Sequence, residues 1–398
     1  MVYLFHGSFW LTVSQVASSL TGFLLAIAFA NLLPKDVYGT YRFILSIVAI
    51  LSAFSLPGIN SALTRSVARG YGLSLIDATM MRMRWGVFTS LVALCVGVYY
   101  LHAGNVQIAL CMTIMAVFVP FFDTFTTASA YVQGLRNFKV DTIASSLIQI
   151  GASAGMAIVM YVHPSVIPVL ISYFASYCLL RFVYYLYAKR AFPPHGEHDS
   201  EVFSYGAHLS FMGILSSVAA NMDKILLFHY LGATDVAIYS IVTAAPEQLK
   251  NLLRNVGPLA TPKLAGASHE TLRRELSPFW RKTLLFALAI VGIMVVYIAA
   301  APFLFHFFFP AYEPYVWLSM LFALSLPTVA TYLPITLLQA QKRTRELYLF
   351  NTIPSVVQIG LYFALIPSFG VVGAVVAWMA GRFFTVIYLV LLIEKTYR

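Results

Sequence analysis

Charged residues inside an apolar stretch of the chain, residues 210–254, are the ones best placed to do chemistry. They include Asp223, Lys224, Glu247, Lys250 and Arg254. Because an ionised group near a bilayer centre costs about 2.5–3.5 kcal/mol, such residues line water, pair with one another or contact a polar substrate. Glu247, Lys250 and Arg254 follow an i, i+3, i+7 spacing, which places them on one face of a helix. The spacing predicts a charged cavity face in which basic groups predominate.

A second polar stripe precedes the first along the chain. It consists of Ser210, Ser217, Asn221 and Lys224, which also follow a helical spacing. Asp223 lies about 100° from Lys224 around the helix, so we expect Lys224 to face the cavity. A structural alternative stays open, in which Asp223 and Lys224 pair with neighbours while Lys250 and Arg254 extend to the membrane interface.

The composition identifies the class of protein. The chain is 60% hydrophobic and 10% charged, with a mean hydropathy of +0.81, whereas soluble domains are about 25% charged. We therefore expect an all-α polytopic membrane protein. The three cysteines have neither disulfide nor zinc spacing. The net charge of +10 does not indicate a nucleic-acid partner, because it is distributed over short connections between apolar segments.

Twelve segments are predicted to span about 30 Å of hydrocarbon, which takes roughly 20 residues each. Their approximate bounds are 8–32, 39–60, 85–103, 106–131, 142–162, 165–187, 204–230, 236–259, 280–304, 316–339, 346–366 and 371–393.

Basic residues lie almost entirely in alternate connections. One side carries Arg65, Arg69, Arg82, Arg84, Arg136, Lys139, Lys189, Arg190, Lys263, Arg273, Arg274, Arg281, Lys282, Lys342, Arg343 and Arg345, and the other carries only Lys35. By the positive-inside rule, both termini are cytoplasmic. The connections 61–85 and 262–281 are expected to form interfacial helices. The connection 192–203 reads as a solvated polar linker rather than a metal site, although it contains His195, Glu197, His198 and Asp199.

A weak internal repeat relates the two halves of the chain. An offset of 198 residues sets residues 16–20 on 214–218 and Tyr41 on Tyr239, and an offset of 201 sets Arg181 on Arg382. Six spans per half keep both halves in the same orientation, with a substrate path expected between them. The predicted organisation is an N-terminal bundle (1–191), a cytoplasmic linker (192–203) and a C-terminal bundle (204–398). Arg181 and Arg382 read as structural residues.

Five short motifs resemble those of the polysaccharide-transport flippases, within the superfamily that also contains multidrug antiporters and lipid II flippases. They are LPKDVYGTY (33–41), YVQGLRNFK (131–139), NMDKILL (221–227), LQAQKRTR (338–345) and LIPSFGVVGA (365–374). The resemblance implies a V-shaped fold of two pseudo-symmetric six-helix bundles. It also implies transport of undecaprenyl-pyrophosphate-linked oligosaccharide across a bacterial or archaeal cytoplasmic membrane by alternating access, in contact with the lipid bilayer and with other polysaccharide-assembly membrane proteins.

Candidate residues for this transport follow from charge and position. We expect substrate contacts from Arg42, Tyr41, Asn221, Lys224, Tyr239, Lys250 and Arg254. Their cations suit a pyrophosphate and their tyrosines suit a sugar ring, although tyrosines at these positions also suit interfacial anchors. No cofactor is expected. Any coupling to Na⁺ or H⁺ would fall on Asp123, Asp223 and Glu247.

Two other classes of protein compete with a flippase. A cation-coupled multidrug exporter of the same fold should present carboxylates without basic neighbours, but here basic residues outnumber carboxylates in the candidate cavity. A membrane glycan polymerase or ligase needs a sizeable outer loop for its chemistry, and every predicted outer connection is short. The sequence therefore favours the flippase.

The topology can be tested by cysteine labelling. In a chain without its three native cysteines, Glu313→Cys should react with an impermeant maleimide added to intact cells, and Ser200→Cys should react only after permeabilisation, because nearly all loop cations lie on the side of Ser200. Labelling of Ser200→Cys from outside would contradict the predicted orientation.

Overall fold

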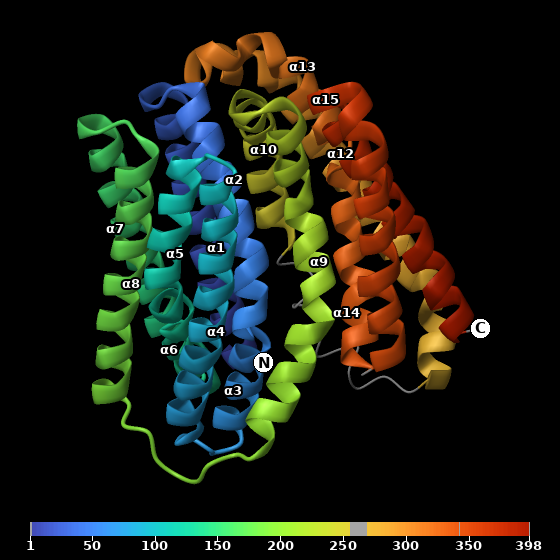
Figure 1. Ribbon diagram of the computed structural model, residues 1–398. Coiled ribbons are helices and arrows are strands. Elements are labelled where there is room, and N and C mark those ends of the chain that lie inside the picture. Colours follow the sequence, from blue (N-terminus) through green and yellow to red (C-terminus); the bar gives the residue numbers. More distant parts are fainter. Residues whose placement is uncertain (1, 255–268, 342, 398) are drawn as a thin grey trace. The chain divides into compact units, whose positions relative to one another are not determined.

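The computed structural model describes residues 2–254, 269–341 and 343–397 (Figure 1). All regular secondary structure in these residues is helical. The chain separates into two compact units, residues 1–221 and 222–398. The division falls inside α9 (Glu201–Leu231). The domain boundaries at residues 191 and 204 that the repeat suggests stay a prediction.

Unit 1 is a bundle of long apolar helices with two short ones. Its elements are α1 (Val2–Leu32), α2 (Lys35–Ser52), η1 (Ala53–Ser55), α3 (Gly58–Ala68), α4 (Ser74–His102), α5 (Val106–Thr124), α6 (Thr127–Gly134), α7 (Phe138–Val162), α8 (Val166–Ala191) and the first half of α9. The main neighbours are α4 with α5, α1 with α7, α7 with α8, and α3 with α6. The short helices α3 and α6 therefore form one pair among helices that are long enough to cross a membrane.

Unit 2 begins with the second half of α9. Its further elements are α10 (Ala233–Arg254), α12 (His269–Phe308), η2 (Pro310–Tyr315), α13 (Val316–Ala323), η3 (Leu326–Thr331), α14 (Tyr332–Ala340) and α15 (Thr344–Tyr397). Inside α15 the backbone leaves helical geometry at Gly370, where φ is 58° and ψ is −133°. A side chain is disfavoured at this φ, so glycine permits the bend that divides α15 in two.

Ten segments of the described residues are helical, long and apolar enough to cross a membrane. The segment 345–396, in α15, has 52 residues, which is enough for two crossings. α10 is not among the ten because it is rich in polar and charged residues, although 22 residues of helix reach about 33 Å. The predicted all-α polytopic membrane fold is confirmed. The predicted span 236–259 runs into residues outside the described part, as does the predicted interfacial segment 262–281.

The helical path of unit 1 is interrupted at two places, directly after the candidate span Lys35–Ser55 and within the candidate span Val106–Gly134. Between α2 and α3 the chain passes through η1 and then Leu56, whose φ of 56° is unusual for a residue with a side chain. Between α5 and α6 the chain turns at Phe125 and Thr126, where the Thr126 hydroxyl donates to the Asp123 carbonyl at 2.7 Å. Irregular backbone at membrane depth is tolerated only where protein or a water-filled cavity satisfies its polar groups. We therefore expect the interior of unit 1 to be polar beside these two breaks.

The region 61–85 is divided between two helices rather than forming one connection, and its interfacial location stays a prediction. Residues 61–68 belong to α3, whose buried Ala62, Leu63 and Val67 join an apolar core with Tyr131 of α6. Residues 74–85 form the start of α4. Arg82 is buried there, so its assignment to a cytoplasmic loop is wrong. The physical reason is that Arg82 has a carboxylate partner inside the bundle.

The connection after α8 lies against the turn between α3 and α4. His198 Nδ1 is 2.6 Å from Asp77 Oδ2, and the Asp199 backbone N–H donates to Ser74 Oγ at 2.9 Å. The Tyr131 hydroxyl donates to the Phe192 carbonyl at 3.0 Å. These contacts give the connection a defined position on unit 1.

The first half of α9 packs tightly on α3. A side chain at Gly206 would meet backbone and side-chain atoms of Ile59 at 2.8 Å, and Ser210 Oγ accepts a hydrogen bond from the Gly58 backbone N–H at 2.9 Å. Small residues of this kind let membrane helices approach closely.

A large side chain at this contact should destabilise unit 1. We expect Gly206→Leu to lower stability by about 1–3 kcal/mol or more, because backbone must move to admit the side chain. Gly213→Leu on the same helix is the matched control, since nothing lies within 4 Å of its added Cβ. Thermal unfolding of the purified protein in detergent measures both. Equal stability of the two variants would contradict the packing described here.

Candidate substrate-binding site

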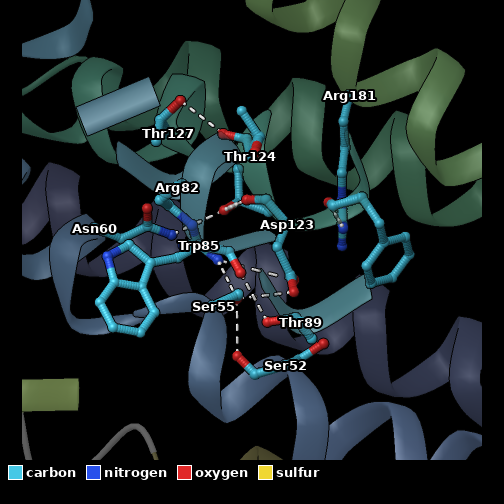
Figure 2. Close-up of polar contacts among 12 residues, drawn as sticks. Ser52, Ser55, Asn60, Arg82, Trp85, Thr89, Asp123, Thr124, Thr127 and Arg181 are labelled. Atoms are coloured by element: carbon cyan, nitrogen blue, oxygen red, sulfur yellow. Dashed lines mark hydrogen bonds and ion pairs between the residues drawn. The ribbon is translucent and has the colours of Figure 1, made fainter. Parts of the chain in front are cut away.

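Asp123 is the centre of a buried polar cluster in unit 1, drawn in Figure 2. Its Oδ2 accepts a hydrogen bond from the Ser55 hydroxyl at 2.9 Å, and its Oδ1 lies 3.8 Å from Nη2 of Arg82. Arg82 also donates to Ser55 Oγ at 3.3 Å. The Arg82 side chain is only 3% exposed. A charge this deeply buried requires a partner, and Asp123 supplies it.

The two helix breaks place these groups together. Ser55 lies in η1, directly before the left-handed turn at Leu56, and Asp123 lies in the last turn of α5. The neighbouring Asn60 donates from Nδ2 to the Thr126 hydroxyl at 2.9 Å, which ties one break to the other. The cluster therefore joins the interrupted segments α2–η1–α3 and α5–α6.

Arg181 of α8 adds a second cation to the interior of unit 1. Its Nη1 donates to the Phe122 carbonyl at 2.7 Å, and its guanidinium lies 4.4 Å from the centre of the Phe122 ring and 4.9 Å from that of Tyr177. Among the residues that the structure describes, no carboxylate lies within salt-bridge distance of it. Arg181 is thus held by aromatic faces and a carbonyl rather than by an opposite charge.

Asp223 and Lys224 of α9 form an ion pair with each other in unit 2. Lys224 Nζ lies 3.1 Å from Oδ1 and 3.2 Å from Oδ2 of Asp223. The ammonium group also lies 5.6 Å from the centre of the Tyr239 ring on α10. Asp223 is 2% exposed. Although the two Cβ atoms diverge by about 100°, the long lysine side chain folds back over its neighbour, which is the structural alternative left open above.

A second ion pair of unit 2 extends into an aromatic contact. Lys250 Nζ lies 2.6 Å from Glu247 Oε1 on α10 and 4.5 Å from the centre of the Trp378 ring on α15. The Arg382 guanidinium lies 4.2 Å from the centre of the same ring. Trp378 also stacks on Phe322, with 5.7 Å between the ring centres. Two cations thus share one tryptophan.

The unit 2 cluster contains more positive than negative groups. Lys224, Lys250 and Arg382 accompany the carboxylates of Asp223 and Glu247, and all three cations interact electrostatically with Glu247. Two buried donors, Arg382 Nε and Trp378 Nε1, have no hydrogen-bond partner in the described part of the chain. Unsatisfied buried donors are costly and rare. The arrangement can therefore accept hydrogen-bonding oxygens that carry negative charge.

Several predicted contact residues have other partners in this structure. Tyr41 is 2% exposed and packs between the Phe29 ring, at 4.9 Å, and Tyr173, at 6.3 Å, in the core of unit 1. Arg42 lies in α2 and interacts electrostatically with Tyr41 and Tyr173. Tyr239 is equally buried and interacts with Asp223. Sugar stacking by either tyrosine stays a prediction.

The polar stripe on α9 contacts helix backbone. Ser217 Oγ donates to the Ala49 carbonyl of α2 at 3.2 Å, and Asn221 Nδ2 donates to the Ser217 carbonyl at 2.9 Å. The Ser217 bond joins α9 to α2, whereas the Asn221 bond stays within α9, and substrate contact by Asn221 stays a prediction. The side chain of Arg254, at the end of α10, lies outside the described residues.

The sequence patterns assign no functional role to Arg82, Arg181 or Arg382 and do not single out Trp378. They predict a loop position for Arg82 because a hydropathy scale treats arginine as polar whatever its partner. A signal existed for the other two arginines: they are repeat mates, and each follows an aromatic residue at i−4, Tyr177 or Trp378. That spacing puts ring and guanidinium on one helix face.

The fold is shared with solved transporter structures. An outward-facing multidrug resistance MATE family transporter of the MOP superfamily superposes with a TM-score of 0.67 at 12% identity, over 98% of this chain and 95% of that one. The inward closed lipid II flippase MurJ gives a TM-score of 0.62 at 12% identity, over 96% and 87%. These likenesses show the fold.

A MOP superfamily transporter from Pyrococcus furiosus, described by the reverse polarity of its binding pocket, superposes with a TM-score of 0.61 at 11% identity. The match covers 99% of this chain and 95% of that one. Among curated proteins, an uncharacterized membrane protein of Methanocaldococcus jannaschii is 21% identical over 98% of this chain and 83% of its own length.

The sequence also matches a family model. Residues 4–253, well over half of the 398-residue chain, match the family described as polysaccharide biosynthesis protein. This agrees with the family that the short motifs indicated. The chain is therefore a member of the polysaccharide biosynthesis protein family, with the fold of the MOP-superfamily transporters.

Proposed function

We propose that the protein moves undecaprenyl-pyrophosphate-linked oligosaccharide across the cytoplasmic membrane by alternating access, with both termini in the cytoplasm. The observation that carries the proposal is the unit 2 cluster: three cations face two carboxylates, and Arg382 and Trp378 hold buried donors without partners. A pyrophosphate supplies the missing negative charge and acceptor oxygens. Family membership supports the same class of substrate.

A protein is needed for this transport because the headgroup is polar. Each unsatisfied hydroxyl or phosphate oxygen costs several kcal/mol in hydrocarbon, whereas the lipid tail can stay in the bilayer. Arginine and lysine among aromatic side chains can replace the lost water around the pyrophosphate. The charged residues of α9, α10 and α15 would thereby lower the barrier to crossing.

The pairing of the carboxylates disfavours export of cationic compounds. Asp123, Asp223 and Glu247 each have a basic partner, at 3.8, 3.1 and 2.6 Å respectively. A cationic drug would have to displace that partner before it gained a counter-ion. Coupling to Na⁺ or H⁺ through these carboxylates would require the same exchange, so we propose that any coupling proceeds by opening one of these ion pairs.

Removal of two cations from unit 2 should weaken binding of the lipid pyrophosphate. We expect Lys250→Gln with Arg382→Gln to lower affinity for undecaprenyl pyrophosphate by about 100-fold, because two charge-assisted hydrogen bonds are lost. Affinity for tetraphenylphosphonium, a lipophilic cation, should be unchanged or higher. Both are measured by titration of the purified protein in nanodiscs.

The matched control carries the same change in net charge at exposed positions, Lys189→Gln with Lys395→Gln. It should bind undecaprenyl pyrophosphate as the unmodified protein does. If the unmodified protein binds the cation and ignores the lipid pyrophosphate, the proposal is wrong and an exporter takes its place.

The Asp223–Lys224 pair can be separated into its structural and functional roles. Lys224→Gln alone should destabilise unit 2 by about 3–5 kcal/mol, because it leaves a buried carboxylate without a partner. Asp223→Asn with Lys224→Gln should recover most of that stability, while Lys224→Arg should preserve both stability and transport.

If Lys224 also serves the substrate, the stable double variant should still fail to move a fluorescent lipid-linked sugar between leaflets in proteoliposomes. Full transport by the double variant would show that Lys224 is purely structural.

A further inference from the structure

Unit 1 contains a pocket that borders its charged cluster at Asn60, Thr126 and Arg181. A cavity of about 350 Å³ lies between α3, α6, α7 and α8. Its lining is mainly hydroxyl and amide groups, including Asn60, Ser129, Gln133, Ser145 and Gln149, with tyrosine and phenylalanine rings between them. The volume falls within the range of about 300–1,000 Å³ that is typical of small-molecule sites.

The pocket offers both hydrogen-bond donors and acceptors. Gln149 Oε1 accepts from the Tyr177 hydroxyl at 2.9 Å, which orients the amide, and Gln149 Nε2 has no hydrogen-bond partner in the described part of the chain. Asn60 Oδ1 is a buried acceptor that likewise lacks a partner there. A free donor and a free acceptor among the residues that line one pocket match a ligand whose groups do both, as a hydroxyl does.

A buried carboxylate behind the pocket fixes part of its lining. Asp141, in the first turn of α7, accepts from Gln133 Nε2 at 2.8 Å and from the Tyr184 hydroxyl at 3.1 Å. These donations leave the Gln133 amide oxygen and the Tyr184 oxygen lone pairs as acceptors. Asp141 itself is not part of the lining. The carboxylate thus positions neutral groups rather than presenting a charge.

Charge at the pocket selects against other ligands. Arg181 is the one charged side chain that lines it, and its guanidinium already bonds the Phe122 carbonyl and packs on two rings. A cationic ligand would meet Arg181 and no lining carboxylate. An apolar ligand would leave the amides and hydroxyls desolvated and unpaired, which is unfavourable.

The position of the pocket supports a role in transport. Phe125 and Thr126, which line it, form the break between α5 and α6. Discontinuous membrane helices commonly form the binding sites of transporters, and irregular backbone is tolerated at membrane depth where it lines such a cavity.

We propose that this pocket binds one sugar unit of the transported glycan, with Gln149 and Asn60 as its hydrogen-bonding contacts and the Tyr177 ring as its apolar wall. The inference rests on the proposed function and adds a site, in unit 1, that recognises the neutral hydroxylated part of the substrate. The pyrophosphate is assigned to other residues, so the two sites can be tested separately.

The test compares two lipids that differ only in the sugar. The full-length protein in nanodiscs is titrated with undecaprenyl pyrophosphate and with undecaprenyl-pyrophosphoryl N-acetylglucosamine. We expect the sugar to tighten binding and Gln149→Leu to reduce that gain by about fivefold or more, as for loss of an oriented hydrogen bond. Affinity for undecaprenyl pyrophosphate should stay unchanged.

Two further variants serve as a control and as a second test of the pocket. Gln107→Leu makes the same change at an exposed position of α5 outside the pocket and should have no effect. Ser145→Phe fills the pocket and should abolish the gain from the sugar. Unchanged thermal unfolding shows that each variant folds.

A third probe separates the inference from the proposed function. Methyl glycosides of glucose, N-acetylglucosamine and rhamnose are titrated without any lipid. Suppose that neither lipid binds, that a methyl glycoside does bind, and that Gln149→Leu weakens binding of the glycoside. The proposed function is then wrong, and the assignment of the pocket as a sugar site is supported. If both lipids bind equally, or Gln149→Leu leaves their ratio unchanged, the pocket assignment is overturned and the proposed function stands. Displacement of a bound glycoside by tetraphenylphosphonium would also overturn it.

Discussion

Charge buried in membrane-spanning helices is the constraint on which the interior of both units depends. Asp123, Asp223 and Glu247 are each paired within their own unit, with Arg82, Lys224 and Lys250 respectively, whereas the buried Asp141 is bonded to neutral groups. An isolated charge there would cost several kcal/mol, so these pairs have to form as the helices pack. What remains after pairing is positive, and it is held by aromatic rings rather than by carboxylates. The proposed preference for an anionic substrate rests on this remaining positive charge.

The internal repeat gives the two units related frameworks with different chemistry. Arg181 and Arg382 are repeat mates, and each lies over the aromatic residue one helical turn before it. Around Arg181 the lining is rich in amides and hydroxyls, whereas around Arg382 it includes two ion pairs with net positive charge. A substrate with a neutral glycan and an anionic pyrophosphate presents both kinds of group. One fold can therefore recognise both parts of the molecule.

The sequence alone predicted the class of fold and most helices, because hydropathy over about 20 residues depends on local composition. It also predicted that residues 223–250 carry unusual charge. It failed where a residue's environment depends on a distant partner. Arg82 looks like a loop residue until Asp123 is placed beside it, and Pro57 and Gly58 mark a turn without showing that Leu56 takes the left-handed conformation. The pocket beside Gln149 could not be foreseen, since serines, threonines and amides are scattered over four helices and only packing unites them.

The most direct test of the central claim is to identify the lipid that the protein retains from its native membrane. The protein is purified in mild detergent and analysed intact by native mass spectrometry, with the bound molecule released and fragmented. The account predicts a polyprenyl-pyrophosphate glycan that is lost from the Lys250→Gln, Arg382→Gln variant, because the unit 2 cations hold the pyrophosphate. Retention of an organic cation in its place, or of the glycan lipid in equal amount by that variant, would contradict it.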